Sequence, residues 1–394
     1  MPMRRCFAAA LAALLLLTLS ACAPSAPEPP EEEPPVTEEP EVQTPDPEPT
    51  PEELAAAEIE DLLSSLTLEE KVGQLFFVRC PAESAVEDVS TYHLGGYVLF
   101  GRDFADKTAD DVIQTICSYQ SASESDTGIP LLIGVDEEGG TVVRVSSNPN
   151  LRPSRYKSPQ KLLSEGGTEA LVADAADKDA LLAALGINVN LAPVADVSTD
   201  PSDFMYDRTC GLDAAGTADC VSAMVAQMAA DGMGSVLKHF PGYGDNVDTH
   251  TGIAVDERSL EHFAASDFLP FSAGIDAGGG TAAVLVSHNI MAAVDPDLPS
   301  SLSPAVHDLL RDKLGFDGVA MTDDLAMEAV AAYSEDGAVA VMALQAGNDL
   351  IITTDYRTQI PRVIEAAENG TLSLERIDQA CRRVLTWKQN LGLV

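Results

Sequence analysis

The chain is poor in positive charge. Its 394 residues contain 23 Lys and Arg against 63 Asp and Glu, which gives a formal net charge of -40. A surface of this sign repels nucleic acid, so no nucleic-acid partner is expected. The sequence also has no glycine-rich phosphate loop, no dinucleotide-binding fingerprint and no HExxH or CxxC spacing. Nucleotide-dependent chemistry is therefore not indicated, and neither a cofactor nor a metal ligand is predicted.

Long apolar runs are missing as well. The run from Phe7 to Leu19 is shorter than the ~20 residues that span a bilayer. It follows a pair of arginines and ends at small residues, which is the order of an export signal. We therefore predict a signal peptide over residues 1–21. The segment that ends at Cys22 also resembles the lipobox of bacterial lipoproteins, which implies a lipid anchor on Cys22 at the outer face of the membrane. Ordinary secretion is the alternative.

The next segment has no positive charge at all. Residues 23–53 hold eleven Pro and eleven Asp or Glu, but no Lys or Arg. This composition cannot bury apolar surface, and its like charges repel one another. We predict a disordered acidic linker over residues 22–53. The remaining residues, 54–394, have a usual length for one large α/β barrel domain.

The cysteines show no metal-site spacing. Beyond the export signal and Cys22 there are five, an odd number: Cys80, Cys117, Cys210, Cys220 and Cys381. Most are predicted to be small buried side chains. Cys210 and Cys220 can form a disulfide in an exported protein, but the sequence does not show whether they come close enough.

Short apolar runs alternate with longer helical patterns through the folded part. Eight runs have the continuous hydrophobicity of strands buried on both faces: Leu75–Val78, Gly96–Phe100, Leu131–Val135, Ile187–Leu191, Ser235–Leu237, Ala283–Val286, Gly318–Met321 and Leu350–Thr353. Amphipathic stretches such as Ala218–Ala230 and Ala338–Ala346 suit crossover helices. A capping box, Thr67–Glu70, predicts a short helix before the first strand. We predict a single (β/α)8 TIM-type barrel, and a doubly wound open sheet is the alternative.

Chargeable residues follow five successive predicted strands. They are Asp136, Asp196, Lys238 with His239, His288, and Asp323 with Asp324. In a barrel the carboxyl ends of the strands meet at one rim, which is where active sites lie. A single such residue is often a helix cap or a satisfied buried group. Their convergence on one rim predicts a functional site.

A polar loop with fixed turn residues extends from Lys238 to His250. Hydrolysis of a glycosidic bond needs one carboxylate and one proton donor, and Asp323 and His250 can fill these roles. Asp248, two residues before His250, can hold the imidazole and favour its protonated form. Two weaker interpretations are a turn cap and a metal site that also includes His239.

Several motifs occur in a fixed order along the folded part. They are Leu66–Leu75, Gly95–Phe100, Val135–Gly140, Lys238–Gly242, Asp248–His250, Val286–His288, Leu314–Phe316 and Met321–Leu325. In this order they resemble glycoside hydrolase family 3, and specifically its β-N-acetylhexosaminidase branch. The resemblance implies a barrel enzyme that removes terminal, non-reducing β-linked N-acetylglucosamine with retention, through a covalent glycosyl-aspartate. Peptidoglycan fragments or amino-sugar oligomers are the natural substrates to expect.

The resemblance also implies residue roles. Asp323 matches the nucleophile, His250 the acid/base residue and Asp248 its partner. The residues that match sugar contacts are Asp136, Arg144, Arg208, Lys238 and His239. Asp324 matches a supporting residue. Two departures from the branch bear on substrate preference: Tyr243 stands where His is usual, and Thr141 where Arg is usual.

Other functions are compatible with the same motifs. A non-catalytic sugar-binding lipoprotein would keep the barrel and lose the chemistry. Asp323, Asp248 and His250 are all present, which argues against this alternative, because loss of any one of them would have favoured it. A phosphorylase is a second alternative, because His repels phosphate less than Glu does. A β-glucosidase or xylosidase of the same family is a third. The sequence does not indicate the oligomeric state.

Overall fold

Parallel strands organise residues 49–394. The computed structural model describes residues 49–244, 246, 254–331, 333 and 339–394. The strands of the main sheet are β1 (Phe77–Arg79), β2 (Gly96–Leu99), β3 (Leu132–Val135), β4 (Val189–Asn190), β5 (Gly234–Phe240), β7 (Ala282–Val286) and β9 (Ala320–Thr322). Each overlaps a predicted strand. A separate two-stranded sheet, made of β6 (Val255–Asp256) and β8 (Ile290–Met291), was not predicted, because two residues carry no detectable periodicity.

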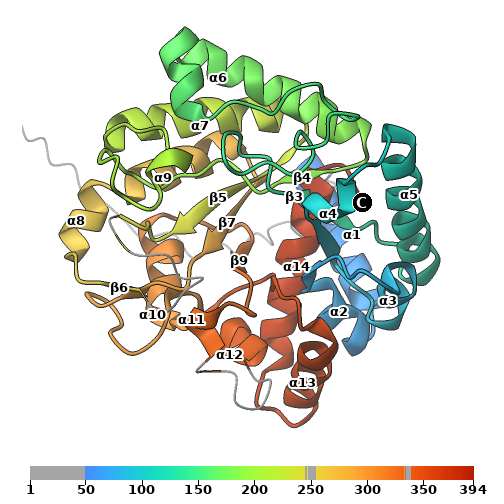
Figure 1. Ribbon diagram of the computed structural model, residues 1–394. Helices are drawn as coiled ribbons and strands as arrows, with labels where there is room; N and C mark the ends of the chain where they lie inside the picture. Colours follow the sequence, from blue (N-terminus) through green and yellow to red (C-terminus); the bar gives the residue numbers. More distant parts are fainter. Residues whose placement is uncertain (1–48, 245, 247–253, 332, 334–338) are drawn as a thin grey trace, which may run out of the picture. The chain divides into compact units, whose positions relative to one another are not determined.

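The strand order decides between the two predicted architectures. The main sheet runs β1-β2-β3-β4-β5-β7-β9, and every neighbouring pair is parallel. This order follows the chain, whereas a doubly wound open sheet reverses its order at a switch point. The α/β fold with a curled parallel sheet is therefore confirmed, and the open-sheet alternative is wrong (Figure 1).

The last predicted strand contacts both edges of this sheet. Leu350 forms a parallel bridge with Met321 in β9, and Ile351 forms one with Phe76, next to β1. The N–H of Phe77 donates to the carbonyl of Ile351 at 2.9 Å, and the N–H of Leu350 donates to the carbonyl of Ala320 at 3.2 Å. The segment that starts at Leu350 thus lies between the first and last strands, paired through isolated bridges.

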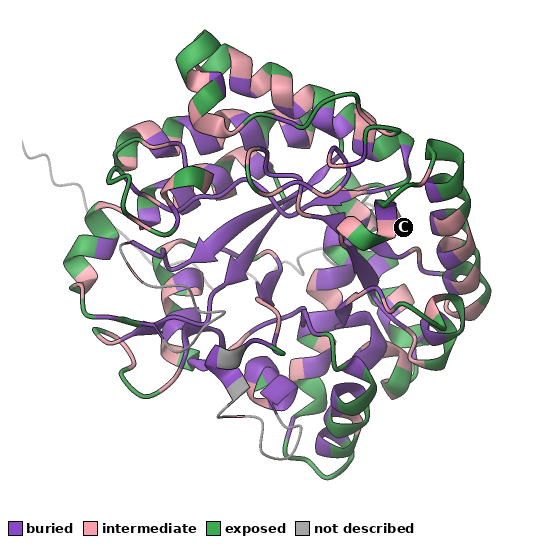
Figure 2. Cartoon of the chain, in the orientation of Figure 1, coloured by how far each residue is buried: buried purple, intermediate pink, exposed green. Residues whose placement is uncertain are grey.

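Helices surround the sheet and turn their buried sides toward it (Figure 2). They are α1 (Pro51–Ser65), α2 (Leu68–Gln74), α3 (Ala85–Thr91), α4 (Gly101–Phe104), α5 (Ala109–Asp126), α6 (Pro159–Ala184), α7 (Ala214–Ala230), α8 (Leu260–Ala265), α9 (Phe268–Gly278), α10 (Pro304–Asp308), α11 (Glu328–Ala331), α12 (Val339–Ala346), α13 (Tyr356–Glu368) and α14 (Leu374–Asn390). Shorter turns are η1 (Tyr206–Arg208), η3 (Ser300–Leu302) and η4 (Leu309–Lys313). The helices predicted from the two amphipathic stretches correspond to α7 and α12.

Capping boxes start several of these helices, including α1, α2 and α5. Thr67 and Glu70 exchange hydrogen bonds at the start of α2, as predicted. Thr50 and Glu53 make the same exchange at the start of α1, with Pro at the first helical position. Helix α1 therefore begins at Pro51, so the last three residues of the predicted linker are helical.

The cysteines of the described region are free. Cys210 and Cys220 are buried in one cluster with three apolar side chains, and no disulfide joins them. Cys80 and Cys381 are buried as well, while Cys117 is exposed. Within the part of the chain that the structure describes, no helix has the length and apolarity needed to cross a membrane.

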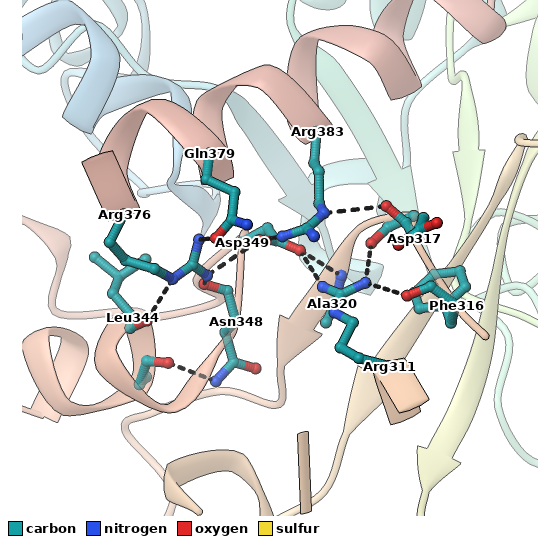
Figure 3. A network of polar contacts seen from close by, with 12 residues as sticks. Arg311, Phe316, Asp317, Ala320, Leu344, Asn348, Asp349, Arg376, Gln379 and Arg383 are labelled. Atoms are coloured by element: carbon teal, nitrogen blue, oxygen red, sulfur yellow. Dashed lines mark hydrogen bonds and ion pairs between the residues drawn. The ribbon is translucent and has the colours of Figure 1, made fainter. Parts of the chain in front are cut away.

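A buried carboxylate joins several elements at the amino ends of the strands (Figure 3). Asp349 is fully buried and immediately precedes the segment that bridges the sheet edges. It accepts hydrogen bonds from Arg311 in η4 at 2.6 Å and from two arginines of α14, Arg376 at 3.0 Å and Arg383 at 3.2 Å. It also accepts the N–H of Ala320 in β9 at 3.1 Å. In TIM-type barrels active sites lie at the opposite, carboxyl-end face, so this cluster is expected to contribute stability.

We predict that Asp349→Asn lowers the free energy of unfolding by about 3–5 kcal/mol, because three largely buried guanidinium groups lose their shared counter-ion. Urea unfolding measures the loss. Asp378→Asn is the matched control: its carboxylate is 39% exposed and pairs with Lys71, so its removal should cost less than about 1 kcal/mol. Equal stability of Asp349→Asn and wild type would show that the cluster adds no net stability.

Candidate active site

Lys238 joins two carboxylates near the carboxyl ends of β3 and β5. Its side chain is only 3% exposed, and Nζ lies 2.7 Å from Oδ1 of Asp136 and 2.6 Å from Oε1 of Glu138. Asp136 directly follows β3, and Lys238 lies in the second half of β5. The structure thus brings together two of the predicted sugar-contacting residues.

Arg208, presented by η1, completes this group. Its Nε and Nη2 donate to the two carboxylate oxygens of Glu138 at 2.9 and 2.7 Å, which is a bidentate ion pair. Its Nη2 also lies 3.3 Å from Nε2 of His239. Two acids, Asp136 and Glu138, therefore face two cations, Lys238 and Arg208. We call these four residues the charge array.

Charge pairing sets the protonation states in the array. Burial alone would raise the pKa of Glu138, but the charges of Lys238 and Arg208 outweigh it and hold that pKa well below its usual range. Burial would likewise lower the pKa of Lys238, but the carboxylates of Asp136 and Glu138 outweigh it, and the pKa is raised. Glu138 and Lys238 are therefore both charged at neutral pH.

A tight turn directs Arg144 to the same site. Its Nη2 lies 3.6 Å from Oδ2 of Asp136, and its guanidinium lies 5.5 Å from the centre of the Phe100 ring. The fully buried carboxylate of Glu137 accepts the backbone N–H of Arg144 at 2.8 Å and that of the next residue at 2.7 Å. Glu137 thereby fixes the turn that points Arg144 at the array.

His239 is oriented by Asp196. Its Nδ1 lies 2.8 Å from Oδ2 of Asp196, and the same carboxylate accepts the backbone N–H groups of His239 and Tyr243 at 3.2 and 2.8 Å. Because Arg208 can only donate, Nε2 of His239 accepts from it and Nδ1 carries the proton. Tyr243 is buried, with its ring edge-on to His239 at 5.3 Å. Tyr243, the first of the two departures from the family pattern, thus packs against His239 from the protein interior. Thr141, the second departure, is exposed.

Asp323 directly follows β9. Its N–H donates to the carbonyl of Val286 in β7 at 3.1 Å, and its Oδ1 accepts the N–H of Asp324 at 2.8 Å. The carboxylate of Asp324 accepts from the hydroxyl of Thr354 at 2.9 Å, and its carbonyl accepts from Nε2 of His288 at 3.1 Å. Asp324 and His288 thus hold the backbone that carries Asp323 at the rim.

The predicted pair Asp248 and His250 lies outside the described residues. The described residues before and after it meet at one cluster, formed by Arg258, Asp256 and Asp267, which we call the Arg258 clamp. Arg258 lies 2.7 Å from Oδ2 of Asp256 and 3.0 Å from Oδ1 of Asp267.

Both flanks of this loop bond to the clamp. On the upstream side, Arg258 donates to the carbonyl of Gly242 at 3.2 Å, and Nδ2 of Asn246 donates to Asp256 at 2.7 Å. On the downstream side, Asp256 and Arg258 follow the loop directly. Gly242 has φ +123°, and a Cβ there would lie 2.3 Å from Oδ1 of Asp267, so only glycine fits.

Comparison with known proteins decides the family. Residues 67–387 match the profile of the glycosyl hydrolase family 3 N terminal domain. The chain belongs to glycosyl hydrolase family 3. The predicted resemblance is therefore confirmed, and the protein is a glycoside hydrolase.

Individual relatives of this family 3 chain agree. An "Uncharacterized secreted glycosyl hydrolase" from Arthroderma benhamiae is 27% identical, and the match covers 79% of this chain and 89% of that protein. A "Beta-hexosaminidase" from Xanthomonas campestris is 34% identical, covering 71% of this chain and 82% of that protein. The solved structure of a family 3 β-N-acetylglucosaminidase from Paenibacillus has a TM-score of 0.77 at 32% identity. That match covers 84% of this chain but only 63% of the solved one.

The site of this family 3 protein contains residues that received no role from the sequence. Glu137 and Glu138 lie in the Val135–Gly140 motif, yet only Asp136 was singled out there. Charge balance is the signal that could have found Glu138, because Arg144, Arg208 and Lys238 around Asp136 alone would leave an excess of buried positive charge. Among the residues that the structure describes, no group of three or more His, Cys, Asp and Glu side chains could hold a metal ion.

We predict that Glu138→Gln destabilises the protein by about 3–5 kcal/mol near pH 7, because Lys238 and Arg208 lose one of their two counter-ions. The pKa of Glu138 is lowered by folding, so its contribution is full above the unfolded pKa of about 4.3 and is lost as the pH falls below it. Urea titrations should therefore show the largest gap between wild type and variant near neutral pH and a shrinking gap below about pH 4.

The control for this prediction is Glu165→Gln, since Glu165 in α6 pairs with Lys157 and Lys161 at the protein surface. It should leave the urea midpoint close to that of wild type. A gap for Glu138→Gln that stays constant into acid would contradict the assigned charge on Glu138.

Proposed function

We propose that the protein is a retaining β-N-acetylhexosaminidase that removes terminal, non-reducing β-linked N-acetylglucosamine. The observation that carries the proposal is Asp323 at the carboxyl end of β9, on the rim where β3 and β5 present the charge array. Membership of family 3 and the names of the matched relatives support it. We further infer that the segment starting at Leu350 acts as an eighth strand and closes a (β/α)8 barrel, which its bridges to β9 and β1 support.

The reaction takes place in two displacements. Asp323 attacks the anomeric carbon while His250 protonates the departing oxygen, which leaves a covalent glycosyl-aspartate. His250, now neutral, then removes a proton from water, which attacks the same carbon from the face that the leaving group left. Asp248 stabilises the imidazolium form of His250 before the first step. Two inversions give overall retention.

The charge array binds the sugar ring in this proposal. Lys238 and Arg208 donate hydrogen bonds to hydroxyl or carbonyl oxygens, while Asp136 accepts from hydroxyl groups. Arg144 and His239 add contacts at its edge. Because ion pairs already fix these groups, the sugar meets donors and acceptors that need little rearrangement.

Location follows from the amino-terminal segments. We propose that residues 1–21 are a cleaved signal peptide, that Cys22 is lipidated, and that an acidic tether links it to a catalytic domain over residues 54–394. The matched fungal relative named as secreted agrees with export. An exported, anchored enzyme of this kind would act on peptidoglycan fragments or amino-sugar oligomers outside the membrane.

Asp323→Ala should abolish turnover while the fold persists, because the change lies at the rim and removes no core volume. With 4-nitrophenyl N-acetyl-β-D-glucosaminide as substrate, we expect kcat to fall at least about a thousandfold. Asp312→Ala, at an exposed position in η4, is the control and should retain full rate. Substantial activity in Asp323→Ala would remove Asp323 from the nucleophile role, and absence of wild-type release would contradict the hexosaminidase proposal itself.

His250→Ala should affect poor leaving groups most, because only they need strong proton donation. For N,N′-diacetylchitobiose we expect kcat/KM to fall by about 100-fold or more, and for the nitrophenyl glycoside by clearly less. Parallel kinetics on the two substrates measure the difference. Equal losses on both would assign His250 to sugar binding instead of proton transfer.

A further inference from the structure

Phe204 is an apolar side chain exposed beside a polar site. Among the described residues with large, exposed apolar side chains it is the only aromatic one, and it is 43% exposed. It lies in the loop that follows β4, on the carboxyl-end side of the sheet, where the charge array also lies. Single exposed apolar residues are common on protein surfaces. A role for Phe204 therefore depends on what its side chain and its turn contact, not on its exposure alone.

The backbone on the amino side of Phe204 is fixed by hydrogen bonds. The carboxylate of Asp203 accepts from the hydroxyl of Ser198 at 2.7 Å. The carbonyl of Asp203 accepts the N–H of Tyr206 at 3.1 Å, which closes a turn around Phe204. The exposed ring therefore stands on an ordered turn.

On its carboxyl side, Phe204 is anchored to the site itself. The next residue, Met205, is 1% exposed and packs with Val194 and Tyr243. Its sulfur accepts from Nη1 of Arg208 at 3.5 Å. The turn that presents Phe204 outward thus continues directly into the residue that binds Glu138.

A series of ring contacts leads from Phe204 to the array. The Phe204 and Tyr243 rings lie 6.0 Å apart at an angle of 46°, and Tyr243 meets the edge of His239 at 5.3 Å. His239 in turn lies 3.3 Å from Arg208. Tyr243 is buried, so Phe204 is the member of this series that presents aromatic surface to solvent.

The charge array and the exposed Phe204 ring differ in chemistry, and this difference matches two successive rings of a pyranose oligomer. Buried charges suit the hydroxyl groups of one sugar ring, whereas an aromatic face suits the C–H face of a sugar ring, which is apolar. The ring held by the array is the terminal one in the proposed function. The ring linked to it extends away from the array, and Phe204 is the exposed aromatic surface that ring contacts connect to the array.

We propose that Phe204 is a binding platform for the leaving-group sugar, that is, the second pyranose ring of a β-linked amino-sugar substrate. This inference rests on the proposed function and adds a preference to it. Substrates whose leaving group is a sugar ring gain a contact that a small alkyl leaving group cannot make.

The test compares two substrates that share the terminal N-acetylglucosamine. They are N,N′-diacetylchitobiose and methyl N-acetyl-β-D-glucosaminide, and the readout is the ratio of their kcat/KM values. In Phe204→Ala we expect this ratio to fall about tenfold, the size of effect that a partly buried aromatic contact provides. Phe204→Leu, which keeps an apolar side chain without an aromatic face, should also lower the ratio. Phe204→Trp should preserve it.

Leu374→Ala is the matched control, because Leu374 is an exposed apolar residue at the start of α14 and is 56% exposed. It should leave the ratio at the wild-type value. An unchanged ratio in Phe204→Ala, with wild type active on chitobiose, would overturn the platform alone. Failure of wild type to release N-acetylglucosamine from either substrate would overturn the proposed function and the platform with it.

Discussion

Charge compensation at the carboxyl ends of the strands is the constraint on which the rim of this protein depends. Lys238 and Glu138 are each almost entirely removed from water, and neither could be buried as an ion without its counter-ions. The chain carries a large negative charge, yet it keeps cations at the centre of its site by surrounding them with carboxylates. Next to this charge-balanced cluster, Glu137 fixes the turn that carries Arg144, and Asp196 orients His239.

The two ends of the sheet use the same residue types for different purposes. At the amino ends, Asp349 accepts hydrogen bonds from three arginines and is fully buried, so its cluster links helices to strands. At the carboxyl ends, the side chains of Asp136 and Arg208 stay 15% and 18% exposed. The carboxylate of Asp136, unlike that of Asp349, thus keeps a solvent-exposed part that a ligand can contact.

The predictable parts of the structure are those that depend on burial along one strand or one helix. Continuous apolar runs identified the strands of the main sheet because both faces of each strand are covered, and Thr67 with Glu70 marked a helix start through purely local bonds. The proximity of Asp136 and Lys238 followed from strand ends meeting at one rim. The bidentate pair of Arg208 with Glu138, the Arg258 clamp and the β6–β8 pair depend on side chains and short segments from distant loops, which leave no periodic trace in a sequence. Asp248 and His250 remain predictions.

The Arg258 clamp has a consequence for how such a protein can change over time. Gly242 and Asn246 on one side, and Asp256 on the other, are bonded in one cluster with Arg258 and Asp267, so the described residues on either side are held to each other. Because the clamp is made by the described residues themselves, changes of sequence between them need not disturb it, whether they arise by selection or by grafting a segment from a relative. Under the proposed function, the proton donor His250 could then vary while the charge array that binds the sugar stays the same.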